Sequence, residues 1–216
     1  MTTADQRRRE TVTTVVLTAV LVALFSLYPV LNHGPARWSP RMPLDAHIPL
    51  WEPMVVPYVS ALLLGPATLV YFAVKRPRLA HSALLAGIML LVTAFLFYVF
   101  AQTRMERPEI TGDDPFSALL RLVYGSDQAY NCFPSLHTGF SVVIGLHWLW
   151  SGHRAGRYAA AWCVLIMAST LLVHQHYLAD LLAGLAVAGT ACLAARRAEP
   201  LLAARRARRG PVRASA

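Results

Sequence analysis

The sequence predicts an all-α fold, a polytopic membrane bundle of six transmembrane helices. Of the 216 residues, 56% are apolar and only 14% are charged, whereas soluble domains contain roughly 45–50% apolar and about 25% charged residues. Long apolar segments alternate with short arginine-containing ones along the chain. This composition excludes a disordered chain. It also leaves too little polar surface for a soluble nucleic-acid-binding domain, so no nucleic-acid partner is expected.

Six segments approach the roughly 20 apolar residues that a membrane-spanning helix needs. They cover residues 13–31, 54–74, 79–101, 138–151, 158–175 and 178–195. The fourth is short and reaches spanning length only if it begins near Ser135. The last two are separated by a few residues, which predicts an antiparallel hairpin. The first follows three arginines, as a signal peptide would, but its length and the lack of an A-x-A-like cleavage site favour an uncleaved helix.

The distribution of the arginines predicts the orientation. The chain carries a net charge of +9, and loops on the cytoplasmic side are generally the ones rich in Lys and Arg. With the N-terminus inside, most of the 20 Lys and Arg residues fall on the inner side, in residues 7–9, 75–78, 154–157 and 196–213. The sequence therefore predicts an N-in, C-in protein of the plasma (inner) membrane. Its parts are a cytoplasmic segment 1–11, a transmembrane domain 12–195 and a basic tail 196–216 that is attracted to lipid.

Two features leave alternatives open. Apolar residues recur at helical spacing in the long outer loop 102–131: Phe116, Leu119, Leu120 and Val123. They predict a short amphipathic helix, which lies either on the membrane surface or on the end of the bundle. In the last span, Gly184 and Ala188 form a face of small residues. That face serves either contact between copies or packing within the bundle, so the oligomeric state is left open.

The pair His176 and Asp180 begins the last predicted span. Polar residues beside a spanning segment are costly and are therefore functional candidates. Residues four apart share a helix face, so Asp180 can accept a hydrogen bond from one ring nitrogen of His176. The other nitrogen is then free as a base or nucleophile. The alternative is a capping aspartate beside a histidine at the membrane interface.

The segment Asn131–His137 leads into the fourth predicted span. A helix start offers free backbone N–H groups and the positive end of the helix dipole, which favour an anion such as phosphate. Pro134 and Ser135 suit such a start, one in the first turn and one as a cap. His137 beside them can give a proton to a leaving oxygen.

Arg107 in the second outer loop is the third candidate. Arginine holds phosphate with a bidentate fork, although Glu106 and Glu109 are equally available partners. Two histidines, an aspartate, a helix start and an arginine thus map to one membrane face. Together they indicate phosphoryl transfer that needs no metal.

A metal site is the weaker interpretation of the same region. His174 and His176 could bind zinc, but no cysteine or carboxylate cluster at ligand spacing supports this. The three cysteines, Cys132, Cys163 and Cys192, are far apart and indicate neither a disulfide framework nor a zinc site. We expect no metal and no cofactor.

These residues resemble the motifs of the type 2 phosphatidic acid phosphatase (PAP2) superfamily. That family has three motifs, in the order Lys-x6-Arg-Pro, Pro-Ser-x-His and Ser-Arg-x5-His-x3-Asp. Here the matches are Arg107-Pro108 to the end of the first, Pro134-Ser135-Leu136-His137 to the second, and Ser169, His176 and Asp180 to the third. The resemblance covers residues 102–184 and implies a PAP2-like six-helix plan around them.

The resemblance also implies a role for each matching residue. His176 resembles the nucleophile that forms a phosphohistidine, Asp180 its orienting partner, and His137 the general acid that protonates the leaving alcohol. The residues that resemble phosphate-binding ones are Arg107, Ser135 and Ser169. The substrate implied is a lipid phosphate or phospholipid, met at the extracytoplasmic face.

Two motif positions depart from the family pattern. The Lys position of the first motif is Phe100, and the Arg position of the third is Thr170. Arg104 or Gln102 could substitute for the missing cations, although no spacing indicates it. A phosphodiester carries one charge and a monoester nearly two, so fewer cations favour a diester and head-group transfer. The flanking sequence is most similar to the branch that contains inositol-phosphorylceramide synthases.

The sequence therefore predicts an integral membrane lipid phosphatase or phosphotransferase that acts through a phosphohistidine. Water as the acceptor would make it a phosphatase, and a lipid or sugar hydroxyl would make it a transferase. The alternative is a non-catalytic membrane protein, such as a transporter or an inactive relative. In that case His137 and His176 would lie too far apart to share one phosphate.

Overall fold

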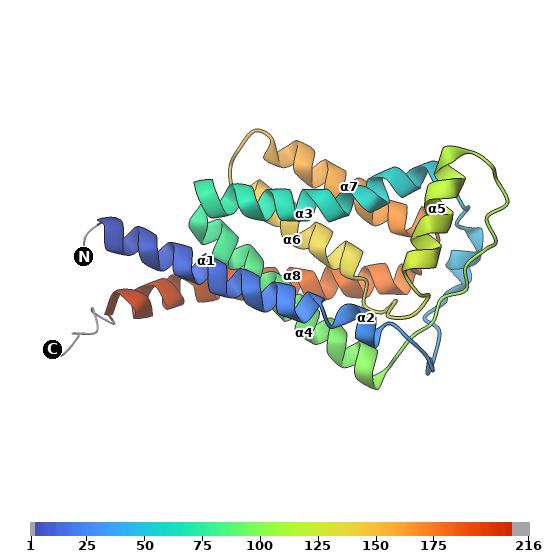
Figure 1. Ribbon diagram of the computed structural model, residues 1–216, viewed down its shortest axis with the longest axis horizontal. Coiled ribbons are helices and arrows are strands. Elements are labelled where there is room, and N and C mark those ends of the chain that lie inside the picture. The colour runs from blue at the N-terminus through green and yellow to red at the C-terminus, as the bar shows by residue number, and fades with distance from the viewer. Residues whose placement is uncertain (1–2, 209–216) are drawn as a thin grey trace.

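The computed structural model describes residues 3–208, and every regular element in this range is a helix (Figure 1). The long helices are α1 (Thr3–Phe25), α3 (Val55–Lys75), α4 (Pro77–Phe100), α6 (Leu136–Trp150), α7 (Gly156–Leu172) and α8 (Leu178–Arg208). The short ones are α2 (Tyr28–Leu31), η1 (Pro43–His47), η2 (Glu52–Met54) and α5 (Pro115–Ser126). Within the described range, β-type pairing is limited to two isolated bridges. The predicted all-α fold is confirmed.

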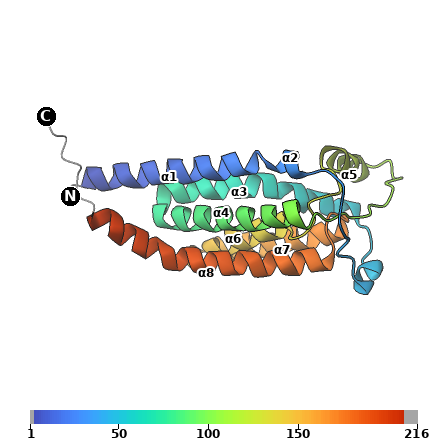
Figure 2. The same ribbon diagram turned by 90° about the horizontal axis from the view of Figure 1, so that it is seen from below.

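The long helices lie side by side as a bundle (Figures 1 and 2). The start of α1 and the end of α8 lie at one end of it, and α5 lies across the other, which we call the α5 end. The connections 32–54 and 101–135 gather at the α5 end, as does the turn between α7 and α8. The fold therefore brings the polar segments singled out from the sequence to one end of the bundle.

Within residues 3–208, four helices are long and apolar enough to be candidates for crossing a membrane, in residues 4–31, 52–75, 77–100 and 178–198. They coincide with the first, second, third and sixth predicted spans. α6 and α7 have 15 and 17 residues. At 1.5 Å per residue they are about 22 and 26 Å long, shorter than the roughly 30 Å hydrocarbon core of a bilayer. α6 starts directly after Ser135, as the length argument required, but ends at Trp150.

The first and last helices extend beyond the predicted spans. α1 begins at Thr3, so it includes the arginines of residues 7–9. α8 continues to Arg208, so the first part of the predicted basic tail is helical. The rest of that tail, residues 209–216, lies outside the described residues. Figure 2 shows both helices reaching past the other long helices at the end opposite α5.

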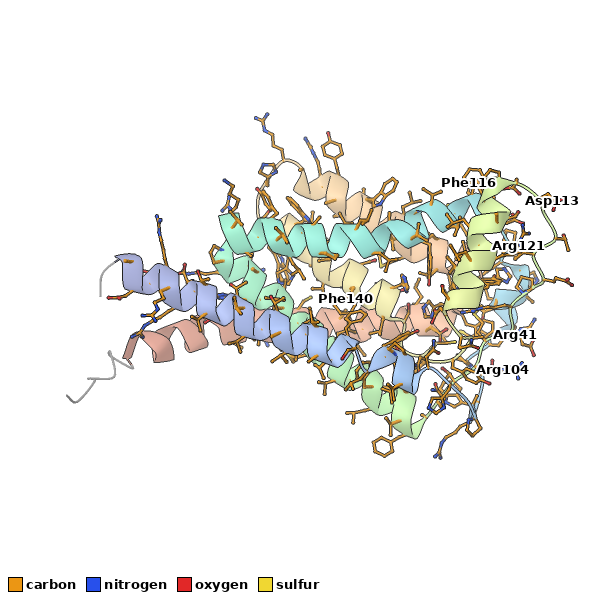
Figure 3. The ribbon with its side chains drawn as sticks, in the orientation of Figure 1. Arg41, Arg104, Asp113, Phe116, Arg121 and Phe140 are labelled. Atoms are coloured by element: carbon orange, nitrogen blue, oxygen red, sulfur yellow. The ribbon has the colours of Figure 1, made fainter. Side chains whose placement is uncertain are left out.

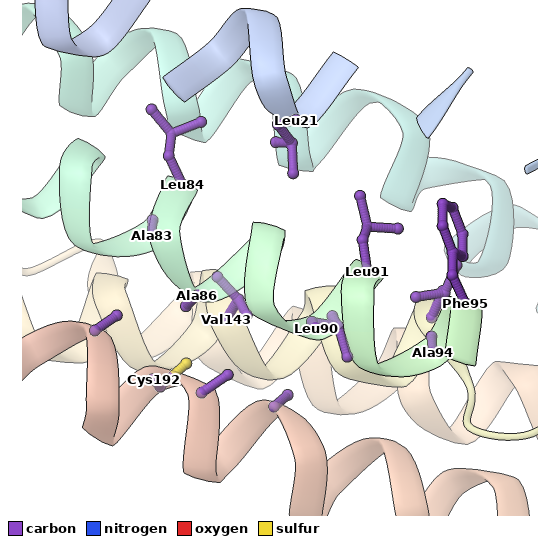
Figure 4. Packing of buried hydrophobic residues seen from close by; sticks show 14 of the residues in the cluster. Leu21, Ala83, Leu84, Ala86, Leu90, Leu91, Ala94, Phe95, Val143 and Cys192 are labelled. Carbon is purple, nitrogen blue, oxygen red and sulfur yellow. The ribbon is translucent and has the colours of Figure 1, made fainter. Parts of the chain in front are cut away.

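α4 lies at the centre of the bundle and contacts α1, α3, α6 and α8. Figure 4 shows its buried side chains, Leu84, Leu90, Leu91 and Ala94, against Leu21 of α1, Val143 of α6 and Cys192 of α8. Lipid tails are as apolar as these residues, so close packing rather than removal from water holds the helices together. One polar contact crosses the core, where Nε2 of His147 lies 2.9 Å from Oγ of Ser82.

α8 packs on α4 and α6, whereas α7 packs mainly on α6 and α3. The last two long helices run antiparallel, but the predicted hairpin packing is wrong because each helix packs mainly on other neighbours. The face of Gly184 and Ala188 packs within the bundle, and Ala188 is fully buried. A Cβ on Gly184 would come within 2.7 Å of the carbonyl oxygen of Ser135. A residue without a side chain is therefore required where α8 meets the start of α6.

α5 is the predicted amphipathic helix, and it packs on the end of the bundle. The Asp114 carboxylate caps its start by accepting two backbone N–H groups of the first turn at 2.8 and 3.2 Å. Leu120 and Val123 are buried in a cluster with Tyr58 and other residues around the start of α3. Phe116 is 40% exposed. α5 therefore packs on the end of the bundle, which was one of the two predicted positions; the other was the membrane surface.

Candidate functional site

Two histidines from different segments of the chain lie close together at the α5 end. His137 lies in the first turn of α6, and His176 lies in the turn between α7 and α8. The centroids of their rings are 6.2 Å apart. The two rings are thus near enough for one phosphate to be a neighbour of both, since a reacting atom has to approach a ring nitrogen to about 3–3.5 Å.

His176 is paired with Asp180 across one turn. Nδ1 of His176 lies 3.5 Å from Oδ2 of Asp180, and the same oxygen accepts the backbone N–H of Tyr177 at 2.8 Å. Asp180 is fully buried, and its Oδ1 has no hydrogen-bond partner among the described residues. Nδ1 of His176 likewise has no hydrogen-bond partner among the described residues, but the negative charge 3.5 Å away favours the tautomer with hydrogen on Nδ1. Nε2 is then the ring nitrogen available for chemistry.

The ring of His137 stacks on Tyr58 of α3. The two ring centroids are 4.2 Å apart and the planes differ by 20°. Tyr58 is 5% exposed, so this contact fixes the plane of the imidazole from the side of α3. Sequence reasoning missed Tyr58 because it lies in an apolar span with no polar residue at helical spacing.

The second and third motifs are held together by their backbones. The N–H of Ser135 donates to the carbonyl oxygen of Asp180 at 3.1 Å, at the close approach that Gly184 permits. The Ser135 hydroxyl caps α6 by accepting the N–H of Thr138 at 3.2 Å. On the other side, the Tyr98 hydroxyl donates to the carbonyl oxygen of Pro134 at 3.0 Å. These bonds fix the start of α6, and hence His137, against α8 and α4.

Arg107 lies beside this site, but most of its donors are already in use. Nη1 donates to the carbonyl oxygens of Tyr124 and Asp127 at 3.4 and 2.5 Å. Nη2 donates to the carbonyl oxygen of Gln128 at 3.4 Å and to Oε1 of Gln175 at 2.6 Å. Only Nε lacks a partner among the described residues. Arg107 was predicted to bind phosphate through its two terminal nitrogens. In the structure those nitrogens instead donate to the end of α5, to the residues after it and to Gln175.

Asp127 is the acidic neighbour of Arg107, with Oδ2 at 3.9 Å from Nη2. Its Oδ1 accepts the amide of Asn32 at 2.6 Å and the hydroxyl of Tyr28 at 3.1 Å. Burial raises the pKa of Asp127 above its ordinary value, and the positive charge of Arg107 opposes that shift. The sequence did not single out Asp127, because it stands many residues from Arg107 in a loop whose course only the fold decides.

The first connection lies against the turn that carries His176. Asp45 in η1 is 8% exposed, and its carboxylate accepts the backbone N–H groups of Met42 at 2.6 Å and Leu178 at 2.8 Å. A cavity of about 20 Å³ remains between η1 and the turn before α8, lined in part by Asp45, His174 and His176. That volume holds about one water molecule, so η1 has to move before a phosphate can enter from this side.

His174 and His176 are held in different directions. His174 has a positive φ of 47°, and its Nε2 lies 3.2 Å from the carbonyl oxygen of Ile48. His176 instead faces Asp180. Among residues 3–208, no group of three His, Cys, Asp or Glu side chains assembles that could hold a metal ion.

The side chains of the remaining predicted residues, all within the described range, form no hydrogen bond with the two histidine rings, although the carbonyl oxygen of Thr170 accepts the backbone N–H of His176 at 3.2 Å. Ser169 and Thr170 are buried at the end of α7, and their hydroxyls donate to carbonyl oxygens of their own helix at 2.6 and 2.7 Å. Phe100, at the end of α4, is 68% exposed. The Gln102 side chain binds the two connections together, because it donates to the carbonyl oxygen of Leu31 at 2.8 Å and accepts two backbone N–H groups.

Arg104 pairs through its backbone with Tyr130 and Trp38, and its side chain is exposed. Figure 3 shows it at the α5 end with Arg41, Arg121 and Asp113. Arg41 pairs with Glu106 at 3.2 Å, whereas Arg104 has no acidic partner among the described side chains. Arg104 is therefore a free positive charge beside the site and not one of its inner contacts.

One comparison with known proteins gave a match. A family model described as "PAP2 superfamily" matches residues 36–194, a range that includes η1 and the whole of α3 to α7. All the residues described at the site except Tyr28, Leu31 and Asn32 lie in that range. No curated protein and no solved structure matches the chain.

Proposed function

Since the chain belongs to the PAP2 superfamily and is a membrane phosphatase-type protein, we propose that it cleaves a lipid phosphoester through a phosphohistidine on His176. The observation that carries this proposal is the facing pair of His137 and His176, 6.2 Å apart, with the Asp180 carboxylate behind His176. A non-catalytic protein would have no need for two rings at the spacing of one phosphate.

In the first half of the reaction, Nε2 of His176 attacks phosphorus. A P–N bond forms as the P–O bond to the lipid alcohol breaks, and His137 gives its proton to the departing oxygen. The Asp180 carboxylate, 3.5 Å from Nδ1, stabilises the positive charge that the imidazole acquires. Asp180 is buried, so this interaction is little weakened by water.

In the second half, a hydroxyl group replaces the lipid alcohol. His137, now without its proton, takes one from water or from an acceptor alcohol, whose oxygen attacks phosphorus. The P–N bond breaks and its electrons return to His176. Water gives free phosphate, and an alcohol gives a new phosphoester.

The phosphate would be held by the α6 start and by Arg107. Thr138 and Gly139 already direct their N–H groups to Ser135, which leaves the N–H groups before them at the helix start to meet an anion. Arg104, exposed and without an acidic partner, would draw an anionic head group towards the site. Ser169 would act indirectly, because its hydroxyl is already bonded within α7.

The charges at this site favour a phosphodiester over a monoester. Arg107 is the cation nearest the proposed phosphate, and Asp127 at 3.9 Å offsets part of its charge. The two cations that the family motifs would add are replaced by Phe100 and Thr170. A doubly charged monoester would be poorly neutralised here, whereas a diester carries one charge. This supports head-group transfer of the kind that inositol-phosphorylceramide synthases perform.

The proposal is tested by product analysis with the purified full-length protein. The protein is incubated with lipids that carry different head groups and are labelled at phosphorus, with and without an acceptor alcohol. We expect it to turn over at least one of these lipids. Labelled free phosphate would identify a hydrolase, and a labelled new phospholipid a transferase. We expect EDTA to leave the rate unchanged. A rate lost in EDTA and restored by zinc would favour a metal site at His174 and His176, and failure with every lipid would favour a non-catalytic relative.

We further propose that the α5 end faces the extracytoplasmic side of the plasma membrane, with six spans and both termini inside. The arginines at the opposite end of the bundle support this orientation. Asp113 and Arg154 are exposed at opposite ends. In intact cells, an impermeant thiol reagent should label Asp113→Cys directly and Arg154→Cys only after the membrane is opened. Labelling of Arg154→Cys in intact cells would contradict the orientation.

A further inference from the structure

Gln175 is a buried amide placed between Arg107 and the nucleophile proposed above. It directly precedes His176, and the backbone N–H groups of both residues donate to the same carbonyl oxygen, that of Thr170, at 3.0 and 3.2 Å. Its side chain is 3% exposed, and its Oε1 accepts Nη2 of Arg107 at 2.6 Å. One turn of backbone therefore fixes the position of the amide relative to the histidine ring.

The orientation of this amide follows from its partner. Arginine has only donors, so the atom that faces Arg107 has to be the oxygen of Gln175. Nε2 shares a carbon with that oxygen and lies next to the guanidinium. It is buried and has no hydrogen-bond partner among the described residues. A buried donor without an acceptor is costly, which makes it a candidate contact for an absent ligand.

A second unpartnered donor lies beside the first. Nε of Arg107 is also buried without a partner, while the terminal nitrogens of Arg107 are spent on carbonyl oxygens and on Gln175. The two free donors belong to side chains in direct contact. They are suited to two oxygens of one anion, and one of them belongs to Gln175, the residue that directly precedes His176.

At the family's third-motif arginine position the chain has Thr170, whose hydroxyl is bonded to the carbonyl oxygen of Met167 at 2.7 Å. Thr170 therefore supplies no donor for phosphate. Its carbonyl oxygen instead holds the turn that carries Gln175. The neutral Gln175 is thus bonded through its backbone to Thr170, the position at which the family motif has an arginine.

We propose that Gln175 is a specificity-determining residue, whose Nε2 donates to a phosphate oxygen in place of a second cation and thereby sets the site to accept a singly charged phosphodiester. This proposal rests on the proposed function, because it places the phosphate beside His176. A neutral donor supplies hydrogen-bond geometry without extra charge. An ionised donor there would form a stronger, charge-assisted bond, and the gain would be larger for a dianion.

Binding of small phosphate probes tests this without requiring turnover. The probes are inorganic phosphate at a pH where it is mainly a dianion, and dimethyl phosphate, a monoanionic diester. The Gln175→Glu variant keeps the acceptor that Arg107 uses and removes the free donor. The Gln175→Arg variant restores a cation. The exposed Gln6, in α1 at the end of the bundle opposite α5, provides matched controls, Gln6→Glu and Gln6→Arg, with the same charge changes outside the site.

We expect Gln175→Glu to weaken binding of both probes by roughly tenfold or more, and Gln175→Arg to tighten inorganic phosphate relative to dimethyl phosphate by about tenfold. The Gln6 variants should change either value by less than about twofold, because exposed charges are screened. A thermal melt of each variant confirms that it is folded. Equal affinities in wild type and Gln175→Glu, or the same ratio change in Gln6→Arg, would overturn the proposal.

The same variants separate this inference from the proposed function. In the turnover assay, Gln175→Arg should shift the kcat/KM preference towards phosphatidic acid, a monoester, and away from phosphatidylglycerol, a diester. If phosphate binding responds as expected but the wild type turns over neither lipid, the enzyme proposal fails and the Gln175 site stands. If the wild type turns over lipid but Gln175→Glu binds and reacts as well as wild type, the Gln175 proposal fails alone.

Discussion

Replacing His176 by Ala is expected to abolish turnover, with a loss of roughly 10³-fold or more, as is usual when a covalent nucleophile is removed. Alanine leaves no atom to form the P–N bond, and no other ring is paired with Asp180. The protein should still fold, because His176 contributes a ring at a nearly closed site and its backbone bond to Thr170 is retained.

The phosphorylated intermediate gives a second measurement of this prediction. Rapid acid-free quenching of the wild type with a lipid labelled at phosphorus should trap label on the protein, stable to base and released by acid. The His176→Ala variant should trap none. The exposed His47, in η1 at the same end of the bundle, serves as the control, and His47→Ala should retain both label and rate. Undiminished turnover in His176→Ala would sink the phosphohistidine mechanism.

Replacing His137 by Ala is expected to slow lipid cleavage by about 10²–10⁴-fold, the usual contribution of general acid catalysis. The leaving lipid alcohol is a poor anion and needs a proton as the P–O bond breaks. The His137 ring faces His176 across the phosphate position and is held by the stack on Tyr58. It is therefore placed to protonate the oxygen opposite the attacking nitrogen.

The nature of the leaving group separates this role from a structural one. A nitrophenyl phosphodiester releases an oxygen that is stable as an anion, so His137→Ala should cleave it at a rate much closer to that of the wild type. A ring that merely supports the fold would lower both rates by the same factor. Equal losses with lipid and nitrophenyl substrates would therefore contradict the general-acid role, even if the lipid rate falls as expected.

The fold could be predicted from the sequence to the extent that apolar length reveals helices. The spans around Val55–Lys75 and Pro77–Phe100 were found within a few residues, because a long apolar segment flanked by arginines has few other stable forms in a membrane. The helix boundaries beyond the membrane were missed, as with α8, which runs on to Arg208. An Ala- and Arg-rich segment has high helix propensity but no apolar signal to mark it.

The packing partners of the helices could not be predicted in the same way. The short turn before α8 suggested that α7 and α8 are neighbours, yet α8 packs on α4 and α6. Helix association in a membrane depends on close steric fit rather than on hydrophobicity. The contact of Gly184 with the backbone of Ser135 is such a fit, and only the assembled bundle shows which surface receives the glycine.

At the site, the sequence by itself determined the chemistry that the chain can carry. Its spacing placed Asp180 close to His176, and the structure has Nδ1 and Oδ2 of the pair 3.5 Å apart. His176 lies just before α8, where the Asp180 carboxylate also accepts the backbone N–H of Tyr177. The motif around Ser135 and His137 likewise predicted a helix start with a histidine in its first turn, and α6 begins there. These are local relations, and local geometry follows directly from sequence spacing.

Only the tertiary structure decided what surrounds those residues. In the tertiary structure, the terminal nitrogens of Arg107 donate to backbone carbonyl oxygens and to Oε1 of Gln175. Asp127 lies beside Arg107, and Nε2 of Gln175 is left without a partner among the described residues. These partners are separated from one another by up to 68 residues in the chain. Their contacts arise because the long connections and the turn before α8 meet at one end of the bundle. The charge of the site therefore depends on Arg107, Asp127 and Gln175, which only the tertiary structure brings together.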